Sequence, residues 1–165
     1  MKRTVLSLIV LTALVVSAPA FAATATANLS VTATVGAVCT ITTTAVAFGA
    51  YDPVSANRST DLAGTGAVNV ACTKGASATI DLGNGSNFAS GTRKMSNGTD
   101  TLSYALYKNT LRTQVWGTGL AGGTTAAYTA ADYNVTAITV YGTVPQAQNV
   151  SVGSYSDTVV ATITY

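Results

Sequence analysis

The feature that most constrains the fold is an uninterrupted alternation of apolar and polar side chains upstream of the first cysteine. Residues 25–35 read ATANLSVTATV, and the apolar members are Ala25, Ala27, Leu29, Val31, Ala33 and Val35. A period of two puts alternate side chains on opposite faces of an extended chain, so this run predicts a half-buried β-strand. A second such run, residues 155–165, places Val159, Ala161, Ile163 and Tyr165 on one face.

These two predicted strands stand at opposite ends of the chain, and neither has an evident partner beside it in sequence. Tyr165 is the final residue, so we expect no later segment to cover the outer edge of the last strand. An unpaired strand edge is a place where another chain can add a strand. We therefore interpret residues 25–35 as a strand that completes the sheet of a second molecule.

Residues 1–22 have the organisation of a secretory signal peptide. Two basic residues precede an apolar run over residues 5–16, and residues 20–22 read Ala-Phe-Ala, with small residues at the cleavage positions. The apolar run is too short for a membrane span, which needs about 20 apolar residues. We predict cleavage after Ala22 and export of a chain that begins at Ala23.

The composition of the exported part favours a β protein with no charged partner. Of the eight Lys and Arg residues, two lie in the signal peptide, and the remaining six balance the six Asp residues. This neutral balance excludes electrostatic attraction to nucleic acid or to anionic lipid. Thr, Val, Ser, Asn and Gly are abundant, and these residues favour strands and turns over helices. The sequence thus predicts a secreted all-β domain.

The residues needed for catalysis are scarce. The chain has no His and no Glu, and its six Asp residues lie mostly beside predicted turns, where they cap the backbone. Nucleotide-binding fingerprints are absent as well. We predict that the protein is not an enzyme and uses no cofactor and no metal.

The two cysteines, Cys39 and Cys72, lie in a chain that carries an export signal. Oxidising compartments favour disulfides, and a metal site would need more ligands than two thiols. We predict a disulfide between them.

The remaining patterns predict about six strands with turns every 8–12 residues or so, which is typical of a Greek-key sandwich. We expect a bent or interrupted strand from Cys39 to a turn at 52–53, a hairpin formed by 66–73 and 76–82, a short strand at 93–95, a central strand at 102–108, a middle strand at 134–141 and a final strand at 155–165. Residues 119–132 are rich in Gly, Ala and Thr, and we expect an exposed loop there. No helix is predicted.

Several of these motifs resemble the spore coat protein U domain family, which includes the subunits of Csu-type archaic chaperone-usher pili. The resemblance rests on the alternating run that ends at Val35, followed by VNVAC (68–72), IDLGNG (80–85), RKMSNG (93–98), LSYALY (102–107), YGTVP (141–145) and GSYSDTVVATITY (153–165). It covers nearly all of the chain after the signal peptide.

The resemblance implies an incomplete immunoglobulin-like Greek-key sandwich that lacks its seventh strand and is completed by donor-strand exchange. It divides the chain into a signal peptide (1–22), an N-terminal donor strand (23–35) and a pilin domain (36–165). It gives the donor role to Leu29, Val31, Ala33 and Val35, and one edge of the acceptor groove to Val159, Ala161, Ile163 and Tyr165. The strand after Cys39 would form the other edge, and members of the family also pair the cysteines that match Cys39 and Cys72.

The implied function is that of a structural pilin subunit in a surface fibre used for adhesion and biofilm formation. Its partners would be identical or related pilin subunits, a periplasmic chaperone and an outer-membrane usher, with membrane contact only through the usher. Export would run through the periplasm to the cell surface. Two alternatives stay open: a surface adhesin, for which Trp116 and Tyr128 could mark a binding loop, and a non-polymerising coat protein that keeps its N-terminal strand in its own sheet.

Overall fold

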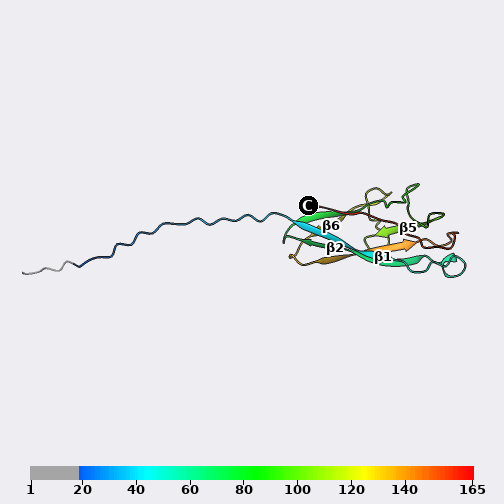
Figure 1. Ribbon diagram of the computed structural model, residues 1–165, viewed down its shortest axis with the longest axis horizontal. Helices are drawn as coiled ribbons and strands as arrows, with labels where there is room; N and C mark the ends of the chain where they lie inside the picture. The colour runs from blue at the N-terminus through cyan, green and yellow to red at the C-terminus, as the bar shows by residue number, and fades with distance from the viewer. Residues whose placement is uncertain (1–18) are drawn as a thin grey trace, which may run out of the picture. The chain divides into compact units, whose positions relative to one another are not determined.

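The computed structural model describes residues 19–165, so most of the predicted signal peptide lies outside the described residues. The chain divides into two units, one ending at Thr34 and one spanning Val35–Tyr165. In the described part of the first unit, residues 19–34, the chain has no regular secondary structure and its side chains are exposed. Within residues 19–165, all strands belong to the second unit (Figure 1).

The second unit is built from two antiparallel sheets, which confirms the predicted all-β sandwich. The larger sheet has the order β1-β2-β7-β5-β4 and the smaller one the order β6-β3-β8. The strands are β1 (Cys39–Ala47), β2 (Leu62–Cys72), β3 (Ser77–Leu82), β4 (Arg93–Ser96), β5 (Thr101–Tyr107), β6 (Ala126–Thr129), β7 (Thr136–Val144) and β8 (Ala161–Thr164), with one 3-10 turn, η1 (Ala56–Arg58), between β1 and β2.

The core lies between the two sheets and is formed by the inward faces of alternating strands. Val68 and Val70 of β2 and Ile80 of β3 are almost completely buried in it. Trp116 follows β5 and is also fully buried, and its indole N–H donates a 2.9 Å hydrogen bond to the carbonyl of Ile80. The period-two pattern thus translates into burial because both sheets have one apolar face to cover.

The predicted hairpin of residues 66–73 and 76–82 is wrong. β2 pairs with β1 and β7, whereas β3 pairs with β6 and β8 in the other sheet. The short turn after Cys72, closed by a 2.9 Å bond from the Ala76 N–H to the Thr73 carbonyl, carries the chain from one sheet to the other. Both strands have a strongly apolar inner face, and stacking these faces buries more apolar surface than placing them side by side.

Three further boundaries differ from the prediction. The expected loop at 119–132 contains β6, whose residues pair with β3 although their small side chains give a weak pattern. β8 occupies only 161–164 of the predicted run 155–165. β1 ends at Ala47, after a change of register between Thr44 and Ala47. The predicted strands at 93–95, 102–108 and 134–141 correspond to β4, β5 and β7, and β7 lies in the middle of its sheet.

Candidate functional site

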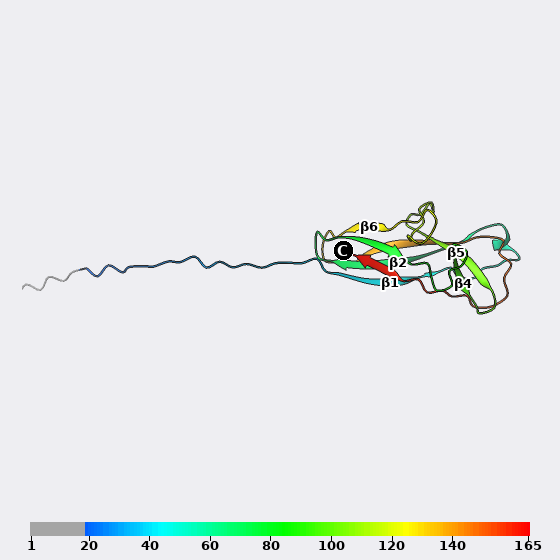
Figure 2. The ribbon, with the colours of Figure 1, turned by 90° about the horizontal axis from the view of Figure 1, so that it is seen from above.

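The two sheets each leave one edge strand unpaired on the same side of the sandwich. β1 ends the larger sheet and β8 ends the smaller one, and the two strands are in contact. Figure 2 shows β1 beside β8, the red arrow. Within residues 19–165 no strand pairs with the outer side of either one. The sandwich therefore has two free strand edges, β1 and β8, next to each other on one side.

The register shows which backbone groups lie on these free edges. Where β1 begins, the Thr73 N–H donates to the Val38 carbonyl at 2.9 Å, so Val38 and every second residue after it face β2. The backbone N–H and C=O groups of residues 39, 41 and 43 therefore point away from β2. In the smaller sheet, the Gly83 N–H donates to the Val160 carbonyl at 2.8 Å, so Ala161 and Ile163 direct theirs away from β3. Two rows of backbone donors and acceptors thus lie on these free edges.

An apolar groove, which we call the β1–β8 groove, runs between the C-terminal half of β1 with the residues that follow it and the segment that leads into β8. It consists of two cavities of about 400 Å³ and about 660 Å³. Both cavities are lined by Val46, Phe48, Met95 and Tyr155, so they form one continuous groove. The first also reaches Leu106 and Val140 of the core, which makes the floor of the groove part of the sandwich interior.

The predicted groove-edge residues are distributed unevenly along this groove. Val159 and Ala161 line the first cavity. Ile163 packs against the core and pairs with Ile80, but it does not line either cavity. Tyr165 lies beyond the end of β8 and is 56% exposed.

The predicted donor residues belong to the exposed first unit and the start of the second. Leu29, Val31 and Val35 are 88%, 85% and 82% exposed, and Ala33 is exposed too. Large aliphatic side chains exposed in an alternating row are rare on a monomeric protein and indicate a surface that another partner covers. No sheet in the described chain covers the apolar side chains of this segment.

Glycines in β2 and β7 give the groove its depth. A Cβ on Gly142 would lie 2.7 Å from two ring carbons of Phe48 and 2.8 Å from Cγ1 of Val46. A Cβ on Gly66 would lie 2.8 Å from Cγ2 of Val46 and 2.6 Å from the Thr44 carbonyl oxygen. The absence of a side chain at Gly66 and Gly142 thus lets the side chains of Val46 and Phe48 lie close against β2 and β7. Sequence reasoning missed these positions, although a glycine within a strand pattern signals such close packing.

A polar cluster fixes the groove edge that precedes β8. The Tyr104 hydroxyl donates to Oδ2 of Asp157 at 2.6 Å, and Oδ1 of Asp157 accepts from the backbone N–H groups of Ser86 and Asn87 at 2.9 and 3.1 Å. Burial, followed by the bond to Asp157, raises the pKa of Tyr104, so this hydroxyl stays a donor. These bonds tie residues 156–158 to the loop after β3.

Arg93 supports the same region from within the core. Its side chain is buried, and its Nη2 donates to the carbonyls of Leu82 and Gly83, both at 2.6 Å. Desolvation lowers the pKa of Arg93 from its ordinary value, and the neighbouring Tyr104 and two carboxylates oppose that shift. Sequence reasoning missed this role, since an Arg-Lys pair in a short strand is usually solvent-exposed.

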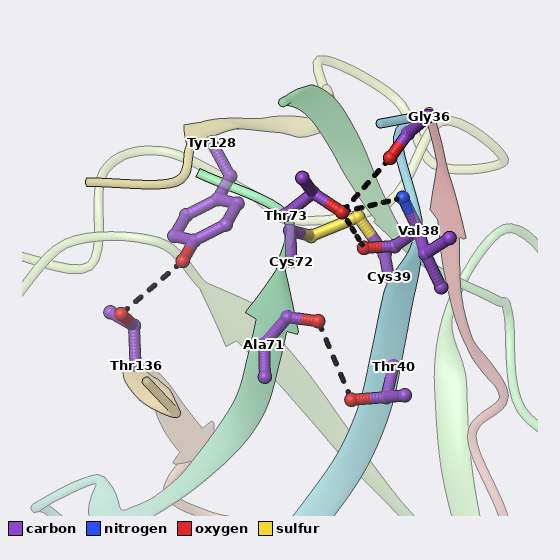
Figure 3. The surroundings of a disulfide bond; sticks show 9 residues. All are labelled: Gly36, Val38, Cys39, Thr40, Ala71, Cys72, Thr73, Tyr128 and Thr136. Carbon is purple, nitrogen blue, oxygen red and sulfur yellow. Dashed lines mark hydrogen bonds between the residues drawn. A yellow bond between two sulfur atoms is a disulfide. The ribbon is translucent and has the colours of Figure 1, made fainter. Parts of the chain in front are cut away.

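The predicted disulfide is confirmed and lies where β1 begins. Cys39 and Cys72 are directly opposite in the register, with an S–S distance of 2.02 Å and Cα atoms 4.1 Å apart. Beside them, the Thr73 hydroxyl accepts from the Val38 N–H and donates to the Gly36 carbonyl, both at 3.1 Å (Figure 3). We call these two hydrogen bonds the Thr73 clamp.

The comparison with known families agrees with this architecture. The family description "Spore Coat Protein U domain" matches residues 25–162, which include both the exposed alternating run and the first two residues of β8. The chain belongs to the Spore Coat Protein U domain family. The resemblance noted from the sequence motifs is thereby confirmed.

Two relatives of this Spore Coat Protein U domain chain are informative. It is 44% identical over 178 residues to Protein U of Myxococcus xanthus, covering 99% of the chain and 98% of the relative. It also resembles one chain of the CsuC–CsuE chaperone–tip adhesion subunit pre-assembly complex from the archaic chaperone-usher Csu pili of Acinetobacter baumannii, with a TM-score of 0.54 and 20% identity. That match covers 80% of this chain and 40% of the other, and it supports the fold.

The described residues offer little other chemistry. Residues 19–165 contain no cluster of three His, Cys, Asp or Glu side chains arranged to hold a metal ion. The same part of the chain contains no helix of the length and apolarity needed to cross a membrane.

Proposed function

We propose that this Spore Coat Protein U domain protein is a structural subunit of a chaperone-usher fibre that polymerises by donor-strand complementation. The observation that carries the proposal is the β1–β8 groove: two unpaired strand edges, one in each sheet, lie beside an apolar groove that reaches the core. The exposed run 25–35 is an extended, alternating segment of the kind that such a groove accepts.

The energetics favour this occupant. Leu29, Val31 and Val35 are almost fully exposed, and burying all three would contribute roughly 5 to 9 kcal/mol before ordering costs, at about 1.5 to 3 kcal/mol for each side chain. The inserted backbone would also pair with the outward-facing groups of β1 and β8. Ala33 would occupy a shallow part of the groove, since a methyl group fills little volume.

A repeating fibre also determines the direction of the donor. β8 runs toward the disulfide end of the sandwich, because it is antiparallel to β3, which begins shortly after Cys72. A donor that ran parallel to β8 would place its Val35 at the disulfide end of the acceptor. The acceptor's own N-terminal segment leaves from that end too, so each subunit would have to contact both of its neighbours there. An antiparallel donor places Val35 at the opposite end, near Pro53 and Val152, and lets subunits follow one another head to tail.

The partners in this proposal are related subunits, a periplasmic chaperone that fills the groove before assembly, and an outer-membrane usher. The likeness to a chain of a chaperone–tip subunit complex supports the first two. The protein would pass through the periplasm to the cell surface, meeting the membrane only at the usher. Adhesion and biofilm formation are the roles we propose for the assembled fibre.

The experiment compares two double variants of the full chain expressed with its own chaperone and usher genes. In L29D/V31D, charges replace two side chains that would enter the groove, so we expect export to the periplasm but no surface fibres in electron micrographs. N28D/S30D adds the same charge on the alternate face and should assemble normally. Normal fibres from L29D/V31D would refute donor-strand complementation by this segment and favour a coat protein with its strand in its own sheet.

A further inference from the structure

We propose that four side chains divide the β1–β8 groove in two and set the register of an incoming donor, because they leave room between them only for the methyl group of Ala33. This inference rests on the proposed function, since it concerns how far that same segment enters the groove. The four side chains, which we call the neck, are the ones that line both cavities: Val46, Phe48, Met95 and Tyr155. Side chains that border two neighbouring cavities stand between them, so a donor has to pass the neck to fill both.

The two walls of the groove place the cavities in the same order. On the β1 wall, the first cavity meets residues within 43–48 and the second meets residues within 46–53. On the opposite wall, the second cavity meets residues 150–155 and the first meets residues within 155–161. A donor antiparallel to β8 therefore passes the first cavity, then the neck, then the second cavity.

Contacts elsewhere in the domain hold two members of the neck in place. A Cβ on Gly64 would lie 2.7 Å from Cδ1 of Phe48, so this ring lies directly against the bare backbone of β2. The same ring packs edge to face with Tyr104, with ring centroids 6.1 Å apart. The Tyr155 hydroxyl donates a 2.8 Å hydrogen bond to the Ser151 carbonyl. Turning either ring aside would lose these contacts, so the neck does not widen freely.

The donor segment offers one small side chain between large ones. Ala33 alternates onto the same face as Leu29, Val31 and Val35, and successive side chains on one face of a strand are roughly 7 Å apart. With Ala33 at the neck, Val31 and Leu29 reach the first cavity and Val35 reaches the second. Both cavities then receive large aliphatic side chains, and the neck between them receives only a methyl group.

Residue counts along the two chains agree with this register. In an antiparallel pair, the numbers rise along one chain and fall along the other. If Ala33 stands beside Tyr155, the two donor residues that precede it on the same face stand beside residues 157–159, which line the first cavity. Val35 then stands beside residue 153, which lines the second cavity.

Other registers fit the groove less well. A shift of two residues in either direction brings Val31 or Val35 to the neck, where a β-branched side chain has little freedom to turn aside and overpacking is destabilising. A shift that brings Ala27 to the neck leaves only Ala25 of the alternating run for the first cavity. The register with Ala33 at the neck is therefore the one that fills both cavities without crowding the neck.

The test measures the uptake of fluorescent peptides of residues 25–35 by the full exported chain, residues 23–165, in the L29D/V31D background with its disulfide intact. One peptide has the unmodified sequence, and the other two carry Ala33→Leu or Thr32→Leu. Ala33→Leu adds bulk at the neck, so we expect it to bind at least about tenfold more weakly than the unmodified peptide. Thr32→Leu adds bulk on the alternate face and should bind like the unmodified peptide.

Variants of the acceptor chain identify the neck as the cause. Met95→Ala shortens the flexible member of the neck, and we expect it to raise the affinity for the Ala33→Leu peptide about tenfold without raising the affinity for the unmodified peptide. Val46→Ala shortens the neck from the β1 wall and should have the same effect. The emission of the buried Trp116 shows whether each acceptor variant has kept its core.

The outcomes separate the neck from the proposed function. Equal uptake of the Ala33→Leu and unmodified peptides would overturn the inference and leave the proposed function intact. The same holds if neither Met95→Ala nor Val46→Ala improves uptake of the Ala33→Leu peptide, because its weak binding would then have another cause. An acceptor chain that does not take up the unmodified peptide would overturn the proposed function itself.

Discussion

Removing the disulfide should destabilise the domain by an amount that follows from its place in the chain. Cys39 and Cys72 are 33 residues apart in sequence. For a loop of that length the chain-entropy relation gives a loss of unfolded-state entropy of roughly 12.5 cal/mol/K, or about 3.7 kcal/mol at 25 °C. We therefore expect C39A/C72A to lower the free energy of unfolding by about 3 to 4 kcal/mol. Alanine avoids burying a hydroxyl at Cys72, which is only 3% exposed.

The measurement is urea unfolding followed by tryptophan fluorescence, in an L29D/V31D background that prevents polymerisation. Trp116 is the single tryptophan of the chain and is fully buried, so its emission reports loss of the core. With a urea dependence of about 1 to 3 kcal/mol/M, the midpoint should fall by roughly 1 to 4 M. The control is the same background with both cysteines and added reductant. It should show the same loss of stability once a thiol assay finds both cysteines reduced.

A loss below about 1 kcal/mol in both experiments would refute the entropic reasoning. It would mean that the unfolded chain already keeps residues 39 and 72 close together. A large loss in the variant but none on reduction would instead assign the effect to the packing of the two side chains.

Two further predictions concern the groove and its loops. Gly142→Ala places a Cβ 2.7 Å from the Phe48 ring. We therefore expect the free energy of unfolding in urea to fall by about 1 to 3 kcal/mol and the groove to take up the 25–35 peptide more weakly. Unchanged uptake would show that Phe48 does not shape the groove. Hydrogen bonds from Ser151 lower the pKa of Asp100, so its contribution to stability is present above the unfolded pKa near 4 and is lost as the pH falls below it. Asp100→Asn should therefore reduce the fall in melting temperature between pH 6 and about pH 3, and an unchanged acid sensitivity would contradict that assignment.

The sequence predicts those parts of the fold that depend on local alternation. Period-two patterns predict β5 and β7. The side chains of Val159 and Ala161 line the groove, on the shared face that the pattern predicts for them. The disulfide could be predicted from the expected export signal and the count of cysteines. For the strands, the facing of each side chain is decided by its immediate neighbours in sequence, and for the disulfide only one pairing of two cysteines is possible.

Pairing between distant strands could not be predicted in the same way. The turn after Cys72 looks like a hairpin turn, yet it joins two sheets, because the partners of β3 lie more than 40 residues further along the chain, in β6 and β8. β6 escaped notice because its alanines give no contrast between its faces. Arg93 and Asp157 likewise depend on carbonyls and N–H groups that only the folded chain brings to them.

The position of the disulfide has a mechanical consequence. A pull on the N-terminal side of the domain reaches β1 first at Cys39, whose covalent partner belongs to β2. Tension therefore bypasses the hydrogen bonds between β1 and β2 and enters β2, whose ladder with β7 extends from Leu62 to Val70. A ladder loaded along its strands must shear many bonds at once, whereas a strand pulled from its end unzips one bond at a time. The disulfide thus protects the β1–β2 ladder from a pull on the N-terminal segment.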